Sequence, residues 1–333
     1  MFRSAIHRKF GRRYTVSEDS LWSAIHRVYP QPVRICRSAI HRVKKIMPEK
    51  TLMPLKHPNR DFFIADILDA SPRDDLASME HPIFSLSKNP DREIRDYEHN
   101  GVKLTVTPSM LGRANIWDKD ILIYCTSQLI AGINLGREPS STVRITAYDL
   151  LTATNRHTGG KNYSQLVKSF ERLAGTQLKT DLKTDDTREL SGFGLIDRWR
   201  IVEHEAKSGR MASIDVTLSD WLYRAVLAKE VLSINADYFR LRGGIERRIY
   251  ELARKHCGKQ SSWRIGIPIL QKKCGSQSNL KHFRNEVKRV IDSDITPDYR
   301  LRYNAEKDQL IFYSRKGMKA AKAEFDDQMK MLF

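Results

Sequence analysis

The sequence predicts an α+β fold built from two tandem copies of one structural unit. Residues 144–174 and 264–294 align without gaps at an offset of 120 residues. Each copy reads as a short strand, a helix, a turn containing glycine and a second helix, followed by strand-like segments. This order is typical of a winged helix-turn-helix, so we expect two such domains in tandem.

The matched positions are mostly apolar and recur at i, i+4 and i+7, which places them on one face of each second helix. The matched pairs are Arg144 with Arg264, Ile145 with Ile265, Leu150 with Leu270, Tyr163 with Phe283, Val167 with Val287, Lys168 with Lys288 and Phe170 with Val290.

Net charge is +18 over 333 residues, and it is unevenly distributed. Residues 1–46 carry 11 Lys and Arg against 2 Asp and Glu, residues 47–235 carry 25 against 26, and residues 236–333 carry 22 against 12. A basic final third favours a polyanionic partner such as nucleic acid, although a solvated basic face would look the same.

Composition narrows the class of protein. No apolar run is long enough to span a bilayer, and we expect no signal peptide and no membrane partner. Cys36, Cys125, Cys257 and Cys274 are too widely spaced for a C-x-x-C pair. This argues against a zinc site and a disulfide framework, and it favours a protein of the reducing cytoplasm.

Before the first copy, three elements are expected. Residues 61–70 are amphipathic and predict a short helix, and residues 93–106 predict a hairpin with Asn100-Gly101 at its turn. Residues 117–133 predict a helix with acidic residues in its first turn. After the second copy, residues 299–303 and 309–314 predict a hairpin.

We divide the chain into four parts. Residues 1–52 form a disordered basic extension, and residues 53–235 form the first winged-helix domain, with dimerisation or accessory DNA contact as its role. Residues 236–316 form the second winged-helix domain and the main DNA-binding domain. Residues 317–333 form an amphipathic tail.

The second helix of a helix-turn-helix lies in the major groove, so the face opposite its apolar stripe should meet DNA. The inner stripe of the second copy is Phe283, Val287, Val290 and Ile291. The predicted DNA-binding residues of this copy are Ser278, Asn279, Lys281, Arg284, Asn285, Lys288 and Arg289, with Arg300, Arg302 and Lys307 in the wing. Those of the first copy are Lys161, Gln165, Lys168 and Arg172.

No catalytic constellation stands out. There is no G-x-x-x-x-G-K-[ST] motif, and none of the 10 histidines lies two residues from another, as the metal pair of a nicking enzyme would require. We interpret Asp185-Asp186 as a wing loop and His256-Cys257 as structural. The chain is therefore predicted not to be an enzyme and to hold no metal or cofactor.

Three blocks resemble the bacterial plasmid replication initiator protein A family. They are DFFIADILDASPRDDLASMEHPIFSLSKNPD, RDYEHNGVKLTVTPSMLGRANIWDKDILIY and RITAYDLLTATNRHTGGKNYSQL, and the resemblance runs from about Met53 to about Ser314. It implies two tandem winged-helix domains. It also implies monomers that bind direct repeats (iterons) at an origin and open the duplex with the host initiator and replicative helicase. Dimers formed through the first domain would repress the chain's own gene.

Two rival functions are a dedicated winged-helix transcriptional repressor and a nicking or priming enzyme. A reporter assay separates the first rival from an initiator, and a cleavage assay tests the second.

The peptide SAIHR occurs at residues 4–8, 23–27 and 38–42. One hypothesis is that the start codon has been placed too far upstream, so that repeated DNA is translated into a repeated peptide. Met47 or Met53 would then be the real start. The spacings of 19 and 15 residues count against it, because 57 and 45 base pairs are not whole turns at about 10.5 base pairs each. The alternatives are a basic DNA-binding arm and a neutral extension.

The chain ends in QMKMLF. Gln328, Met329, Met331 and Phe333 resemble the short peptide by which bacterial proteins dock on the polymerase sliding clamp. The alternative is the end of an amphipathic helix beginning at Met318.

Overall fold

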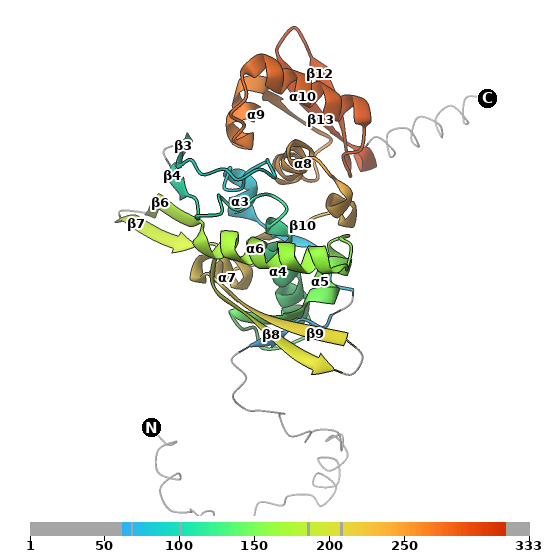
Figure 1. Cartoon of the computed structure of the whole chain (residues 1–333). Coiled ribbons are helices and arrows are strands. Elements are labelled where there is room, and N and C mark those ends of the chain that lie inside the picture. The colour runs from blue at the N-terminus through green and yellow to red at the C-terminus, as the bar shows by residue number, and fades with distance from the viewer. Residues whose placement is uncertain (1–61, 68, 100–101, 185–186, 207–208, 318–333) are drawn as a thin grey trace, which may run out of the picture. The chain divides into compact units, whose positions relative to one another are not determined.

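The computed structural model describes residues 62–67, 69–99, 102–184, 187–206 and 209–317, which have a mixed α+β fold (Figure 1). The SAIHR repeats, the Asn100-Gly101 turn, Asp185-Asp186 and the four clamp-like residues lie outside the described residues. Within the described ranges, no helix is long and apolar enough to cross a membrane.

We call the described residues from 62 to 233 the first half and residues 234–317 the second half. The elements of the first half are β1 (Phe63–Ile64), β2 (Arg73–Asp75), α3 (Leu76–Glu80), β3 (Arg95–His99), β4 (Val102–Thr107), α4 (Lys119–Asn134), β5 (Thr142–Thr146), α5 (Ala147–Ala153), α6 (Gly160–Gly175), β6 (Gln177–Thr184), β7 (Thr187–Gly194), β8 (Ile196–Ala206), β9 (Gly209–Leu218), α7 (Asp220–Leu227) and β10 (Val231–Ser233). Those of the second half are η1 (Ala236–Arg240), α8 (Gly244–His256), β11 (Ser262–Gly266), α9 (Ile267–Cys274), α10 (Leu280–Ser293), β12 (Tyr299–Asn304) and β13 (Gln309–Ser314).

The internal duplication is visible in the element boundaries. The bounds of β5 and β11 differ by 120 residues, and so do the first residues of α5 and α9 and those of α6 and α10. One further helix precedes each copy, α4 in the first half and α8 in the second, and it is longer than the first helix of its copy (α5 or α9). The strand order is also the same, since β5-β9-β8 in the first half corresponds to β11-β13-β12 in the second.

Three further predictions are confirmed. Residues 93–106 form the antiparallel pair β3 and β4, in which Arg95 lies opposite Val106. Residues 117–133 contain most of α4. The two strands expected after the second copy are β12 and β13, which pair antiparallel from Tyr299 opposite Ser314 to Asn304 opposite Gln309.

The helix predicted over residues 61–70 is wrong. Phe63 and Ile64 instead form β1, which pairs parallel with β5. The Phe63 ring is buried against α4 at Gly132, where an added Cβ would lie 2.4 Å from a ring atom. Tertiary packing of this ring outweighs the helical pattern of a short segment.

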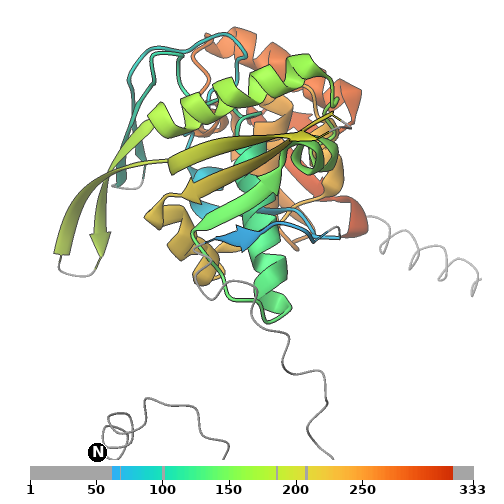
Figure 2. The ribbon, with the colours of Figure 1, turned by 60° about the horizontal axis from the view of Figure 1, so that its bottom comes forward.

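The first half also contains a hairpin that the second half lacks. β6 and β7 join β3 and β4 in a separate sheet of order β3-β4-β6-β7. The strands that flank Asp185-Asp186 therefore belong to this sheet, whereas β8 and β9 occupy the place of β12 and β13. Figure 2 shows α6 running along the sheet β1-β5-β9-β8, where Phe170 stacks on Trp199 with 5.7 Å between ring centroids.

Buried apolar side chains form two clusters. One contains residues of the first half, from Phe63 to Val226. The other contains buried residues of the second half, from Ile234 to Phe312, together with Met79 of α3 and Ile123 of α4. The two halves are therefore joined by apolar side chains of the first half that enter the core of the second.

A buried cluster of charged side chains also connects the two halves, at a contact region that we call the joint. The ammonium of Lys119, fully buried at the start of α4, lies 2.7 Å from Oδ2 of Asp74 and 3.0 Å from Oε1 of Glu251 on α8. The hydroxyl of Tyr238 donates to the same Glu251 oxygen at 2.8 Å. Burial opposes ionisation of Glu251, but Lys119 and Arg248 together lower its pKa.

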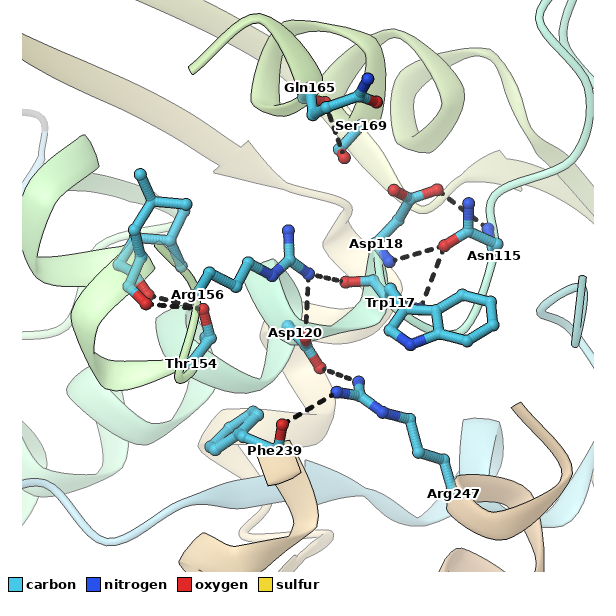
Figure 3. A network of polar contacts seen from close by, with 12 residues as sticks. Asn115, Trp117, Asp118, Asp120, Thr154, Arg156, Gln165, Ser169, Phe239 and Arg247 are labelled. Carbon is cyan, nitrogen blue, oxygen red and sulfur yellow. Dashed lines mark hydrogen bonds and ion pairs between the residues drawn. The ribbon is translucent and has the colours of Figure 1, made fainter. Parts of the chain in front are cut away.

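Asp120 carries a second contact across the joint (Figure 3). Its carboxylate accepts from Arg247 of α8 at 2.6 Å and from Arg156 at 2.8 Å. Arg247 also donates to the carbonyls of Phe239 and Leu241, and the side chains of Asp120 and Arg247 are both almost fully buried. Buried charges of this kind need their partners, because an unpaired one is strongly destabilising.

We expect Lys119→Met to lower the free energy of unfolding by about 3–5 kcal/mol at pH 7, because the buried carboxylate of Glu251 would lose the Lys119 cation beside it. Urea denaturation measures the change. Lys103→Met is the control: Lys103 and its partner Glu98 are exposed, and their 3.8 Å ion pair should contribute less than about 1 kcal/mol. Equal stability of the two variants would contradict the assignment.

Stability should also depend on pH through Asp74. Burial, only partly offset by Lys119 and reinforced by Glu251 and Asp75, raises the pKa of Asp74 to about 8. Between its ordinary pKa and 8 the folded chain holds a proton that the unfolded chain has released, so stability falls as pH rises towards 8 and levels off above it. Asp74→Asn should remove this fall in the urea midpoint between pH 6 and 8. An equally steep fall in this variant would rule out Asp74 as the cause.

Candidate nucleic-acid interface

The turn between α9 and α10 is fixed by two residues. Gly275 ends α9 in the left-handed conformation with φ of 69°, and a Cβ there would lie 2.7 Å from Pro82 of the first half. Asn279 then caps α10, since its Oδ1 accepts the backbone N–H of His282 at 2.8 Å. The predicted DNA-binding residue Asn279 thus caps the start of α10. The backbone carbonyl of Ser278 beside it accepts a hydrogen bond from the Gln271 side chain at 2.5 Å.

α10 separates apolar from basic side chains as the sequence predicts. Phe283, Val287 and Val290 are buried at 3% exposure or less. On the opposite face the exposed predicted residues are Lys281, Asn285, Lys288 and Arg289. None of these four forms an ion pair within the described residues, while Lys288 lies over the ring of Tyr303 with 5.6 Å to the centroid.

Arg284 has a different environment from its neighbours. Its guanidinium makes two hydrogen bonds to Asp308, at 2.9 and 2.8 Å, and Tyr303 donates to the same carboxylate at 2.7 Å. The hydrogen bond with Asp308 raises the pKa of Arg284, and that with Arg284 lowers the pKa of Asp308. Because Asp308 lies in the β12–β13 turn, this trio fastens the turn to α10.

The predicted wing residues lie on two different parts of the hairpin. Lys307 is exposed in the turn, and its backbone N–H donates to Asn304 at 3.1 Å. Arg300 and Arg302 are exposed on β12 and alternate with the buried Tyr299 and Leu301. They therefore point away from the core, to the outer face of the sheet, while α10 packs on the inner side.

The predicted residues of the first half are also divided. Lys161, Gln165 and Lys168 are exposed along α6, and Figure 3 shows Gln165 accepting the Ser169 hydroxyl through its carbonyl, at 3.0 Å. Arg172 turns inward and makes two hydrogen bonds of 2.7 Å to Asp118, which raise its pKa. Its side chain is 15% exposed, so Arg172 is not free to meet a ligand.

Arg264 on β11 is the functional candidate that sequence reasoning missed. It is exposed and lies opposite Ile311, the residue that Arg302 faces from the other side. Its alignment with Arg144 was a usable signal, but the periodicity of α10 pointed to helical residues alone. In the described part of the chain, no group of three or more His, Cys, Asp or Glu side chains is placed to hold a metal ion.

Comparison with known proteins places the chain in a family. Residues 73–301 match a family described as Replication initiator protein A. A "Putative replication protein" from Wigglesworthia glossinidia brevipalpis is 42% identical over 259 residues, which are 77% of this chain and 94% of that protein. The fold and these matches define a replication initiator. The chain belongs to the Replication initiator protein A family, which confirms the resemblance seen in its sequence.

One solved structure supports the fold independently. A crystal structure of domains 2 and 3 of RctB matches with a TM-score of 0.52 at 10% identity, over 69% of this chain and 94% of that chain. A second structure of RctB domains 2–3 matches with a TM-score of 0.49 at 9% identity, over 71% and 95%. At so low an identity the first match shows a shared fold and nothing of function.

The trio of Arg284, Asp308 and Tyr303 can be tested through the tyrosine. Its hydrogen bond to Asp308 raises the pKa of Tyr303. Asp308→Asn keeps a residue that tolerates the positive φ of 46° but removes the charge. We therefore expect the pKa of Tyr303 to fall towards its ordinary value, measured by NMR titration of the tyrosine ring carbons. Tyr303→Phe identifies the Tyr303 signal among the three tyrosines of the hairpin, and an unmoved Tyr303 would disprove the contact.

Proposed function

We propose that this initiator binds directly repeated duplex sites at a plasmid origin with α10 in the major groove, opens the duplex and supports replisome loading. The exposed face of α10, with Lys281, Asn285, Lys288 and Arg289, carries the proposal. Asparagine can pair with adenine, and lysine and arginine with guanine or phosphate. The buried stripe behind them holds this face outward.

We further propose that each half is a winged helix. Helix, strand, helix, helix and two strands follow in that order from α8 to β13, and the order β11-β13-β12 suits a hairpin wing. The same order from α4 to β9, interrupted by β6 and β7, supports this reading for the first half. Exposed Lys161, Gln165 and Lys168 then supply an accessory DNA contact.

Repression of its own gene by a dimer is part of the proposal, with the first half as the dimer contact. The support is apolar exposure near the sheet β3-β4-β6-β7. Ile94, Met110 and Leu190 are 60%, 90% and 62% exposed. A second copy is the simplest partner for such side chains, and a concentration-dependent mass by analytical ultracentrifugation would test it.

The double change Lys288→Ala and Arg289→Ala should weaken binding to an origin repeat. It should also lower the slope of log affinity against log salt by about 0.9 for each phosphate that the variant no longer neutralises. The repeat is first located by footprinting around the gene, and fluorescence anisotropy at several salt concentrations gives both quantities. Lys179→Ala, an exposed lysine on β6, is the control and should leave them unchanged. Unaltered affinity and slope in the double variant would refute the role of α10.

A further inference from the structure

A cavity of about 190 Å³ lies where the two halves meet. Its walls come from described residues between β1 and β2, from α4 and α5, and from η1 of the second half. Ala65, Ile67, Pro72 and Phe239 form much of its apolar lining. An apolar cavity of about 150 Å³ is already large enough to bind benzene. The space therefore suits a small molecule with an apolar body.

A buried tyrosine of α4 has no partner in this cavity. Tyr124 lines the cavity and is only 8% exposed. Within the described residues its hydroxyl forms no hydrogen bond, and protein atoms do not enclose that hydroxyl completely. Buried hydroxyls are nearly always hydrogen-bonded, because an unmet polar group costs free energy. The hydroxyl of Tyr124 therefore faces open space in which a ligand can bond to it.

The charge of the cavity is negative. Asp149 of α5 and Asp66 line it, and among the described residues no Lys, Arg or His does. Arg137 pairs with Asp66 at 2.5 Å, whereas Asp149 forms no ion pair within the described ranges and its Oδ2 accepts the Thr146 hydroxyl at 2.6 Å. Burial raises the pKa of Tyr124, and Asp149 and Asp66 raise it further. This field favours a cation over an anion or a neutral molecule.

Asp149 also has a structural role, but the fold does not require its charge. Its backbone N–H donates to the Thr146 hydroxyl at 3.0 Å, and Thr146 caps α5. At an offset of 120 residues, Gly266 and Ile269 stand in the places of Thr146 and Asp149, and α9 begins there without a side-chain cap. The duplicated unit therefore folds with an apolar residue at this position, and the carboxylate of the first copy is available to a ligand.

We propose that this cavity binds a small aliphatic amine, whose ammonium donates to the Tyr124 hydroxyl and the Asp149 carboxylate and whose hydrocarbon chain packs on Phe239. An ammonium has three donors and no acceptor, and its hydrogen bonds to a carboxylate are stronger than neutral ones. Because Phe239 belongs to the second half, a bound amine contacts both halves and stabilises the folded chain. The site goes beyond DNA recognition and does not depend on which sequence α10 binds.

The test is a titration of the full chain, without DNA, with n-butylammonium chloride, followed by ligand-observed NMR. n-Butanol carries the same hydrocarbon chain without the charge, and it should bind at least about fivefold more weakly. Tyr124→Phe removes only the hydroxyl and should weaken n-butylammonium binding at least about fivefold. Asp149→Asn removes the charge and should weaken it at least about tenfold.

Two matched controls make the result specific. Tyr148→Phe removes a hydroxyl from the same helix at a residue that is 60% exposed and does not line the cavity. Asp69→Asn removes an exposed carboxylate that also lies outside the cavity, so it measures general attraction of cations to the surface. Both variants should keep the original affinity. Circular dichroism and urea midpoints without ligand confirm that all variants are folded.

Saturable n-butylammonium binding that weakens in both cavity variants and in neither control supports the proposal. Equal affinity for n-butanol overturns it, because the cavity would then recognise only a hydrocarbon chain. Absence of saturable binding, or an unchanged affinity in Tyr124→Phe or Asp149→Asn, also overturns it. Since no DNA is present, failure of the proposed duplex function would leave this result unaffected.

Discussion

The arrangement of the described chain depends on burying the Lys119 ammonium between two carboxyl groups, one from each half. Asp74 lies on β2 and Glu251 on α8, so the cation is satisfied only while the halves stay joined. α8 also supplies Arg248, whose guanidinium donates to the carbonyls of Ser78 and Glu80 on α3 and to that of Lys273 on α9. One side chain thus caps the ends of two helices, one from each half.

This joint determines how α10 is presented. α8 forms part of the core on which α10 rests, and Gly275 in the turn before α10 packs on Pro82 of the first half. The position of α10 is therefore tied to the first half by buried charge on one side and close backbone packing on the other. Because buried ion pairs contribute more to specificity than to stability in several systems, we interpret the cluster as fixing this geometry.

Sequence patterns predicted the elements governed by local periodicity, and they failed where distant contacts decide. The offset of 120 residues located β5, β11, α6 and α10, because apolar spacing reports which side of a helix or strand is buried. β1 was missed because its conformation depends on Phe63 fitting over Gly132. In the site, periodicity identified the outer face of α10 correctly. It could not show that Arg284 and Arg172 are occupied by Asp308 and Asp118, since those partners are 24 and 54 residues away.

The two halves differ in whether acidic side chains pair with the arginines at equivalent positions. In the first half, Asp215 pairs with two arginines of one sheet row, and Asp118 pairs with Arg172 on the predicted outer face of α6. In the second half, Ile311 takes the place of Asp215, and Asp292 lies where the offset places the counterpart of Arg172. Duplication supplied the same scaffold twice. Acidic partners pair with arginines in the first copy, whereas the second copy has exposed cations on both α10 and the sheet. This difference supports our proposal that the second copy makes the main DNA contacts.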